Sequence, residues 1–176
     1  MKFSLELGNE LPVDRHPGPH IEDLVEQTRA VREMGFHSLL FGQHYLSHPL
    51  QTLQPLPLIG RIAAEAGEMW LGTGILLLPL LHPVDVAEQV ATMDIICKGR
   101  FILGLGLGYE IEEFEAFEIE RKTRVSRFEE SLAIIKMLWT QDTVTFHGRH
   151  FNLENARPTL RPIQKPHPPV WIAANN

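Results

Sequence analysis

Hydrophobic and polar positions along the chain alternate between two spacings, one typical of strands and one typical of helices. Short apolar runs predict five strands, at 2–7, 38–42, 70–78, 101–105 and 170–173. Between them, apolar residues recur at helical spacing and predict four helices: about 21–34, about 59–66, one that opens at Pro83 and one that ends near Trp139. Strands this apolar, alternating with amphipathic helices, predict an α/β fold with helices covering a parallel sheet.

The segments between these elements carry turn-forming residues. The stretch 8–20 is rich in Pro and Gly and predicts a loop, in which Pro17-Gly18-Pro19 disfavours a helix. Two short β-forming runs joined by Gly148-Arg149 predict a hairpin insertion at about 143–153. A proline-rich linker, 158–169, then leads to the last strand. We expect one domain over 1–176.

Composition narrows the class of protein. The net charge is -6, so the chain has no basic excess to neutralise a phosphate backbone, and we expect no nucleic-acid partner. The single cysteine, Cys97, excludes an intramolecular disulfide and suits a reducing compartment. The longest apolar stretch, 70–81, is too short to span a bilayer, and the first residues do not resemble a signal peptide. These features predict a soluble, cytoplasmic protein without a membrane partner.

A glycine-rich turn after the fourth strand raises a competing architecture, the open nucleotide-binding sheet. The turn reads Gly104-Leu-Gly106-Leu-Gly108, which lacks the G-x-G-x-x-G spacing of dinucleotide sites. Six glutamates follow between positions 110 and 120, and they would repel a pyrophosphate. We therefore reject the nucleotide site, and we expect the glutamate-rich segment to be a solvated face.

An ordered set of motifs resembles the bacterial luciferase-like monooxygenase family from Met1 to Ala173. The motifs are Gly35-Phe-His-Ser-Leu-Leu-Phe-Gly-Gln-His44, Leu71-Gly-Thr-Gly-Ile75, Gly99-Arg-Phe-Ile-Leu-Gly-Leu-Gly106 and Pro169-Val-Trp-Ile172. The resemblance implies a TIM-type (β/α)8 barrel whose active site lies at the carboxyl ends of the strands. Such a barrel takes eight strands and about 250 residues. The chain therefore corresponds to about five of the eight strands, an incomplete barrel.

The resemblance also implies a flavin-dependent oxidoreductase. Its cofactor would be reduced FMN, supplied by a separate flavin reductase and used with O2 on a small organic substrate, in a homo-oligomer. Coenzyme F420 is the alternative cofactor, although the glycine-rich turn lacks the E-x-L-N-E continuation of some F420 enzymes. Three interpretations of the short length stay open: a fragment of a longer enzyme, a half that pairs with itself or another half, or a non-catalytic flavin-binding or assembly protein.

The resemblance assigns roles to particular residues. His44 would be the acid or base, because imidazole titrates near neutrality, although Gln43 and Tyr45 depart from a frequent Glu and a frequent second His on either side of it. Thr73, Gly74 and Ile75 would lie behind the flavin ring, often with a cis peptide at Gly74–Ile75. Further cofactor contacts would come from Gly106, Tyr109 and Asn175, the last at the phosphate. Tyr109 is equally plausible as a rim residue, and we expect no metal site.

Overall fold

Five parallel strands form the centre of the protein in the computed structural model, which describes residues 1–174. Their order across the sheet equals their order along the chain, and each neighbouring pair is parallel. The strands are β1 (Ser4–Glu6), β3 (Ser38–Phe41), β5 (Trp70–Thr73), β7 (Phe101–Gly106) and β10 (Val170–Ile172). The predicted α/β class and strand order are therefore confirmed.

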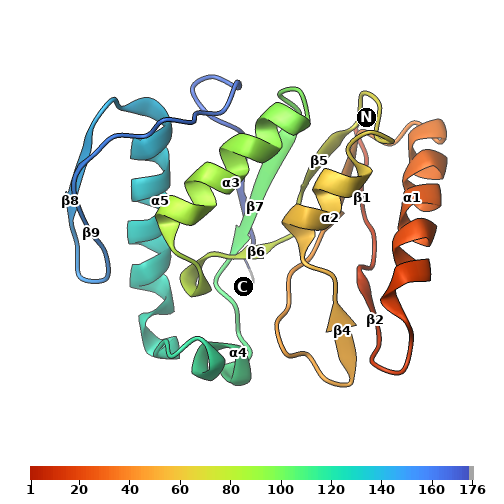
Figure 1. The fold of residues 1–176 in the computed structure, drawn as a ribbon, viewed down its shortest axis with the longest axis horizontal. Helices are drawn as coiled ribbons and strands as arrows, with labels where there is room; N and C mark the ends of the chain where they lie inside the picture. Colours follow the sequence, from red (N-terminus) through yellow and green to blue (C-terminus); the bar gives the residue numbers. More distant parts are fainter. Residues whose placement is uncertain (175–176) are drawn as a thin grey trace.

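Four long helices cover one face of this sheet (Figure 1). They are α1 (Pro17–Glu33), α2 (Pro55–Ile62), α3 (Pro83–Ile96) and α5 (Arg124–Thr140). Shorter helical segments are η1 (Leu78–Leu80), α4 (Ile111–Ala116) and η2 (Arg121–Thr123). Between residues 1 and 174, the chain forms no helix that is both long and apolar enough to cross a membrane.

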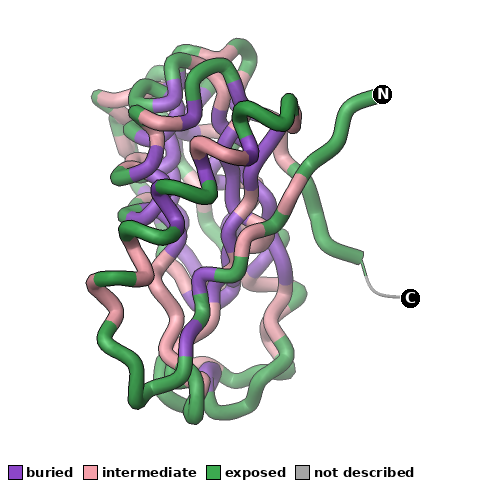
Figure 2. Tube along the Cα trace, turned by 90° about the vertical axis from the view of Figure 1, so that its right-hand side faces the viewer, coloured by how far each residue is buried: buried purple, intermediate pink, exposed green. Residues whose placement is uncertain are grey.

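The core lies between the sheet and the helices because alternate strand residues point to opposite faces. Leu39, Phe41, Phe101 and Leu103 are fully buried in the cluster that the helices cover. The other face is more open, and Figure 2 shows that the exposed segments at the two ends of the described chain lie on one side of the buried centre. Within the described residues, the edge strands β1 and β10 each pair on one side only.

The first and second helices begin earlier than the sequence pattern predicts. We expected a loop through residue 20, but α1 begins at Pro17, and α2 begins at Pro55 rather than near residue 59. A proline in the first turn of a helix loses no hydrogen bond, because the first N–H groups have no partner within the helix. The His16 ring also caps α1, since its Nδ1 accepts a hydrogen bond from the Gly18 N–H at 3.1 Å.

Two further differences lie at the carboxyl ends of the strands. β2 (Glu10–Pro12) pairs antiparallel with β4 (Leu50–Thr52), inside segments that we expected to be loops. The expected strand 70–78 is interrupted after Thr73 by a cis peptide between Gly74 and Ile75, the bond that the resemblance implies. The chain then resumes as β6 (Leu76–Leu77), which also pairs with β7.

An antiparallel hairpin, β8 (Val144–His147) and β9 (Asn152–Ala156), lies between α5 and β10 in the chain. It extends beyond the helices at one side of the molecule (Figure 1). The carboxylate of Glu130 on α5 accepts hydrogen bonds from the backbone N–H groups of Arg149, His150 and Phe151. These bonds anchor the turn of the hairpin to α5.

Candidate active site

The segment that carries His44 leaves the carboxyl end of β3 and is fixed by the buried side chain of Gln43. The Gln43 Oε1 accepts a hydrogen bond from the Leu77 N–H at 2.9 Å. Its Nε2 donates to the Tyr45 hydroxyl at 2.8 Å and to the Gln54 Oε1 at 3.0 Å. One amide therefore joins the end of β3 to β6 and to the start of α2.

The backbone on both sides of Gln43 is also held by side-chain amides. Gln54 donates from Nε2 to the carbonyl oxygen of His44 at 3.0 Å. Asn9, which is buried, donates to the carbonyl oxygen of Gly42 at 2.9 Å. His44 is thus presented from a backbone that has little freedom to move.

Glu113 on α4 orients the ring of His44. The His44 Nδ1 and the Glu113 Oε1 lie 3.2 Å apart, and the Tyr45 N–H donates to the same oxygen at 2.8 Å. An ionised carboxylate can only accept hydrogen bonds, so this contact favours the tautomer with the proton on Nδ1. The Nε2 of His44 is then the nitrogen available to exchange a proton with a bound molecule.

The burial of Glu113 corrects our expectation for the glutamate-rich segment. The side chain of Glu113 is 2% exposed, whereas that of His44 is 29% exposed. Glu110, Glu112 and Glu115 on the same segment are exposed, as expected. Sequence reasoning missed Glu113 because its role depends on a contact with a residue 69 positions away.

Tyr45 next to His44 stays neutral over a wide pH range. Burial raises the pKa of its hydroxyl above the ordinary value, and the negative charges of Glu113 and Asp85 raise it further. The ring packs edge-to-face against Phe117, with 4.7 Å between the ring centroids. The hydroxyl is therefore a fixed neutral group beside the histidine.

A shelf of backbone lies next to His44 on the inner side of the sheet. Gly74, Ile75, Gly42 and His44 are among the residues that line a cavity of about 200 Å³ there. The Ile75 side chain lies against Gly106, in the space that a Cβ at position 106 would occupy. A glycine is therefore required at position 106 for Ile75 to hold this place.

Thr73 lies beneath the same shelf. It is fully buried, and its hydroxyl donates to the Gly104 carbonyl oxygen at 2.6 Å and accepts from the Gly104 N–H at 2.9 Å. The hydroxyl thus ties β5 to β7 beside the cis peptide. Of the cofactor residues expected from the sequence, Gly74 and Ile75 line the cavity with His44, whereas Thr73 and Gly106 support it from behind.

A larger cavity, about 500 Å³, lies on the other side of His44. Tyr109 lines it, and the rings of Tyr109 and His44 meet edge-to-face with their centroids 6.0 Å apart. Glu113 and three other glutamates also line this cavity. Asn175, the expected phosphate contact, lies outside the described residues.

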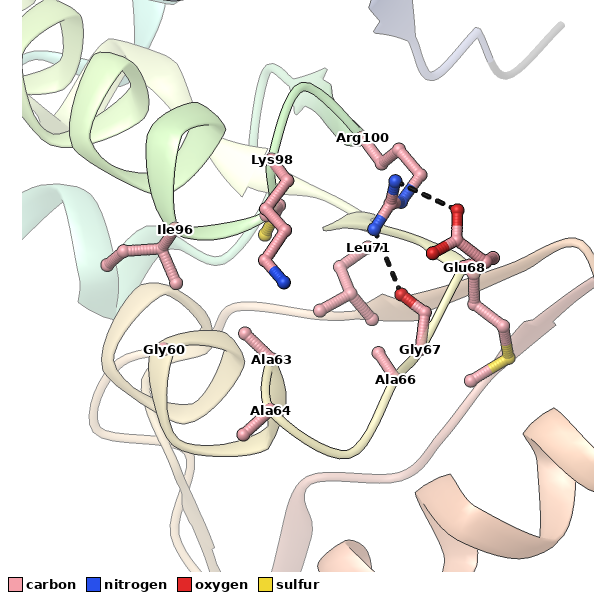
Figure 3. A pocket seen from close by; sticks show the side chains of 12 residues that line it. Gly60, Ala63, Ala64, Ala66, Gly67, Glu68, Leu71, Ile96, Lys98 and Arg100 are labelled. Atoms are coloured by element: carbon pink, nitrogen blue, oxygen red, sulfur yellow. Dashed lines mark hydrogen bonds and ion pairs between the residues drawn. The ribbon is translucent and has the colours of Figure 1, made fainter.

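A third cavity, about 420 Å³, lies at the amino ends of β5 and β7, away from every residue that the sequence nominated (Figure 3). Small residues at the end of α2 and in the segment that follows it line much of the cavity, and Arg100 closes one side. The Arg100 guanidinium pairs with Glu68 at 3.0 Å and donates to the Gly67 carbonyl oxygen at 3.0 Å. Cys97 also lines this cavity, and burial, with the charge of Asp94, raises the pKa of its thiol to about 12. Lys98 adds a positive charge to the lining, so this cavity carries charges of both signs.

Comparison with known proteins places this arrangement in a family. The family model described as luciferase-like monooxygenase matches residues 1–176. The chain is 27% identical, over its whole length and 49% of the relative, to the oxygenase component of a flavin-dependent trigonelline monooxygenase from Acinetobacter baylyi. It is 33% identical, over 86% of the chain and 47% of the relative, to an F420-dependent glucose-6-phosphate dehydrogenase from Amycolatopsis mediterranei.

Solved structures show the same relationship. The crystal structure of the monooxygenase RslO1 from Streptomyces bottropensis matches with a TM-score of 0.88 and 28% identity. The match covers 98% of this chain and 53% of that structure, so the chain spans about half the length of the relatives it matches. The α/β fold is that of an incomplete luciferase-like TIM barrel, and the chain belongs to the luciferase-like monooxygenase family.

Proposed function

We propose that this chain forms the histidine-bearing half of the active site of a flavin-dependent monooxygenase that uses reduced FMN and O2 on a small organic substrate. The observation that carries the proposal is the position of His44. Its ring is held by Glu113 and lies between the Gly74–Ile75 shelf and the larger cavity. One histidine thus borders both a place for a cofactor ring and a place for a substrate.

The residues of the shelf fit a flat ring. Gly42 and Gly74 have no side chains to cover the peptide between Gly74 and Ile75, and a Cβ at Gly42 would meet other atoms only at 3.5 Å. In the part of the chain that the structure describes, no lysine or arginine lines either cavity beside His44. The described residues therefore suit the ring of a flavin, while its phosphate would be held from elsewhere, as the expected role of Asn175 implies.

Each nearby group has a defined task under this proposal. When bound, the reduced flavin supplies the electrons that activate O2. His44 moves a proton through Nε2, and Glu113 holds the ring so that Nε2 faces the substrate. Thr73 and Gly106 keep the shelf in place from behind, and Tyr109 closes the substrate cavity. A separate reductase would supply the reduced FMN, in keeping with the relative named as an oxygenase component.

An F420-dependent dehydrogenase is the second candidate. It is favoured by the 33% identity to a relative with that name. A histidine held by a carboxylate is also suited to take a proton from an alcohol while a hydride leaves it. The two candidates share the shelf and His44, and they differ in the cofactor that the shelf accepts.

Titration of the chain with FMN and with coenzyme F420, followed by quenching of the fluorescence of each cofactor, tests both candidates. We expect FMN to bind more tightly. Gly42→Leu should weaken FMN binding about tenfold, because the new side chain enters the space over the shelf. Gly60→Leu is the matched control, since a side chain there also enters open space but lies at the other end of the sheet.

Three results decide the outcome of this titration. Tighter binding of F420 would replace the first candidate with the second. Equal effects of the two leucine variants would remove the shelf as the cofactor site. Failure of both cofactors to bind would contradict a flavin or deazaflavin function for the chain and favour the non-catalytic alternative.

A further inference from the structure

The larger cavity beside His44 is lined by negative charge without a compensating cation. Its four carboxylates come from Glu10 on β2 and from Glu110, Glu112 and Glu113 at α4, and the lining includes no lysine or arginine. Between residues 1 and 174, none of these four side chains pairs with a lysine or an arginine. A cavity lined in this way has a negative potential, which favours a cationic ligand.

Some carboxylates elsewhere in the protein are compensated by a cation or by backbone N–H groups. Glu65 pairs with Arg29, which lowers the pKa of Glu65. Glu120 pairs with Lys122, and Glu130 accepts three backbone N–H bonds. The carboxylates at the cavity differ from these because, among the described residues, four of them line one cavity together without a lysine or an arginine.

A second observation comes from Glu113, which lines the same cavity. Its Oε1 accepts from His44 and Tyr45, but its Oε2 is buried and has no hydrogen-bond partner among the described residues. A buried carboxylate oxygen without a donor costs free energy, so native sites usually supply one. A positive charge in the adjoining cavity would stabilise this carboxylate.

Aromatic rings complete the lining. Tyr45 and Tyr109 both border the cavity, and each has its ring in edge contact with a neighbour, Phe117 and His44 respectively. The face of a tyrosine ring attracts an organic cation. A volume of about 500 Å³ is large enough for a molecule of one or two rings.

We propose that this cavity binds an organic cation, a ring-sized molecule that carries a quaternary or protonated nitrogen, as the substrate presented to His44. The inference rests on the proposed function for the identity of the reaction, but the choice of ligand rests on the lining alone. The positive nitrogen lies among the glutamates of α4 and Glu10, while the tyrosine rings pack against the body of the molecule. Phosphorylated and other anionic substrates are disfavoured by the same charges.

Three probes of one shape and different charge test this selectivity. They are 1-methylnicotinamide, a cation, 3-methylbenzamide, its neutral isostere, and 3-methylbenzoate, an anion. Binding to the chain is measured by isothermal titration calorimetry at pH 8, without flavin. We expect the cation to bind about tenfold more tightly than the neutral isostere, with the difference falling as salt screens the glutamates. The anion should bind most weakly.

Charge-removing variants locate the effect. Glu110→Gln together with Glu112→Gln should reduce the preference for the cation to about twofold or less, because both exposed charges leave the lining. Glu115→Gln is the matched control, since it removes one exposed charge from α4 outside the lining and should leave the preference intact. Circular dichroism checks that each variant keeps the helical content of the parent chain.

The result separates this proposal from the one on which it rests. Equal binding of the cation and its isostere, a preference for the anion, or equal effects of the double variant and Glu115→Gln would each overturn the cation site. None of these results bears on the flavin titration, which uses different probes and tests a cavity that none of the varied glutamates lines. A chain that selects cations but fails to bind FMN or F420 would keep the cation site and lose the flavin proposal.

Discussion

The two ends of the parallel sheet each carry a cavity with charged residues, but only at one end do charges of both signs line the cavity. At the amino ends, Arg100 pairs with Glu68, Lys98 adds a positive charge, and the remaining lining is largely small and apolar. At the carboxyl ends, Glu113 is buried with one oxygen unpaired, and three more glutamates face the same cavity. Both cavities are of similar size, about 420 and 500 Å³, so volume does not distinguish them.

The difference teaches that charge balance is a better guide to a ligand site than the size of a hollow. Polar groups that pair with one another stabilise the fold and gain no free energy from a ligand. A buried polar group without a partner is stabilised when a ligand supplies one. In barrels of this kind, the carboxyl ends of the strands carry the chemistry and the amino ends carry stability. Three predictions follow from this difference between the carboxyl and amino ends of the strands, and the result of each could contradict it.

Replacement of His44 should have the largest effect. In an enzyme assembled with this chain, His44→Ala should lower turnover about 10²- to 10⁴-fold, because a positioned acid or base is lost. The dissociation constant for FMN should change less than about twofold, since the shelf remains. Turnover by stopped-flow absorbance and affinity by fluorescence titration measure the two quantities.

Lys98→Ala is the control at the other end of the sheet. Lys98 lines the amino-end cavity, and its loss should change neither turnover nor FMN affinity. If His44→Ala left turnover unchanged, His44 would have no part in the reaction. If Lys98→Ala matched the loss seen with His44→Ala, the functional division between the two ends would be wrong.

Replacement of Thr73 should affect stability more than function, although this residue lies at the carboxyl end of β5. Thr73→Val keeps the shape of the side chain but leaves the Gly104 N–H and carbonyl oxygen without the hydroxyl that now bonds both. We expect the free energy of unfolding to fall by about 2 kcal/mol, measured by urea denaturation. Thr73→Ser keeps the hydroxyl and should lose less. A large loss of FMN affinity without a loss of stability would mean instead that Thr73 contacts the cofactor.

The smallest expected effect is the pH dependence of stability that the thiol of Cys97 causes. The ordinary thiol pKa is 9.0, and in the folded chain it is about 12. Above pH 9 the unfolded chain loses the thiol proton while the folded chain keeps it, so the unfolded state binds fewer protons and stability falls as pH rises toward 12. We expect the stability advantage of the parent chain over Cys97→Ala to shrink by about 1 kcal/mol between pH 8 and pH 10.

Urea denaturation at several pH values measures this difference. Because Tyr45 is present in both proteins, its own raised pKa cancels in the comparison. A constant advantage across this range would show that the thiol of Cys97 titrates normally and that the amino-end cavity is more open to water than its lining suggests. Turnover at neutral pH should be the same in both proteins.

Much of the fold could be predicted from the sequence because strand and helix periods are local signals. The runs at 38–42 and 101–105 correspond closely to β3 and β7, and Pro83 does open α3. The early start of α1 was missed because prolines were taken as helix breakers, although the first turn tolerates them. The strands β2 and β4 were missed because three residues are too few to show a period.

The candidate site could be predicted only in part. His44, Gly74 and Ile75 were found through motifs that lie near strand ends, and the structure brings them together around one cavity. Glu113 carried no signal, because its neighbours at 112 and 115 are exposed glutamates of the same kind. Its contact with His44 joins residues 69 positions apart, and no local pattern encodes such a contact.

The amide of Gln43 limits how this region can be exchanged between relatives. Its Nε2 donates to the Gln54 Oε1, which in turn leaves the Gln54 Nε2 to donate to the carbonyl of His44. A glutamate at position 43 could not donate, so Gln54 would have to turn its own amide toward it and release His44. Anyone grafting this loop into another barrel must therefore transfer positions 43 and 54 as a pair, or the histidine will arrive without its support.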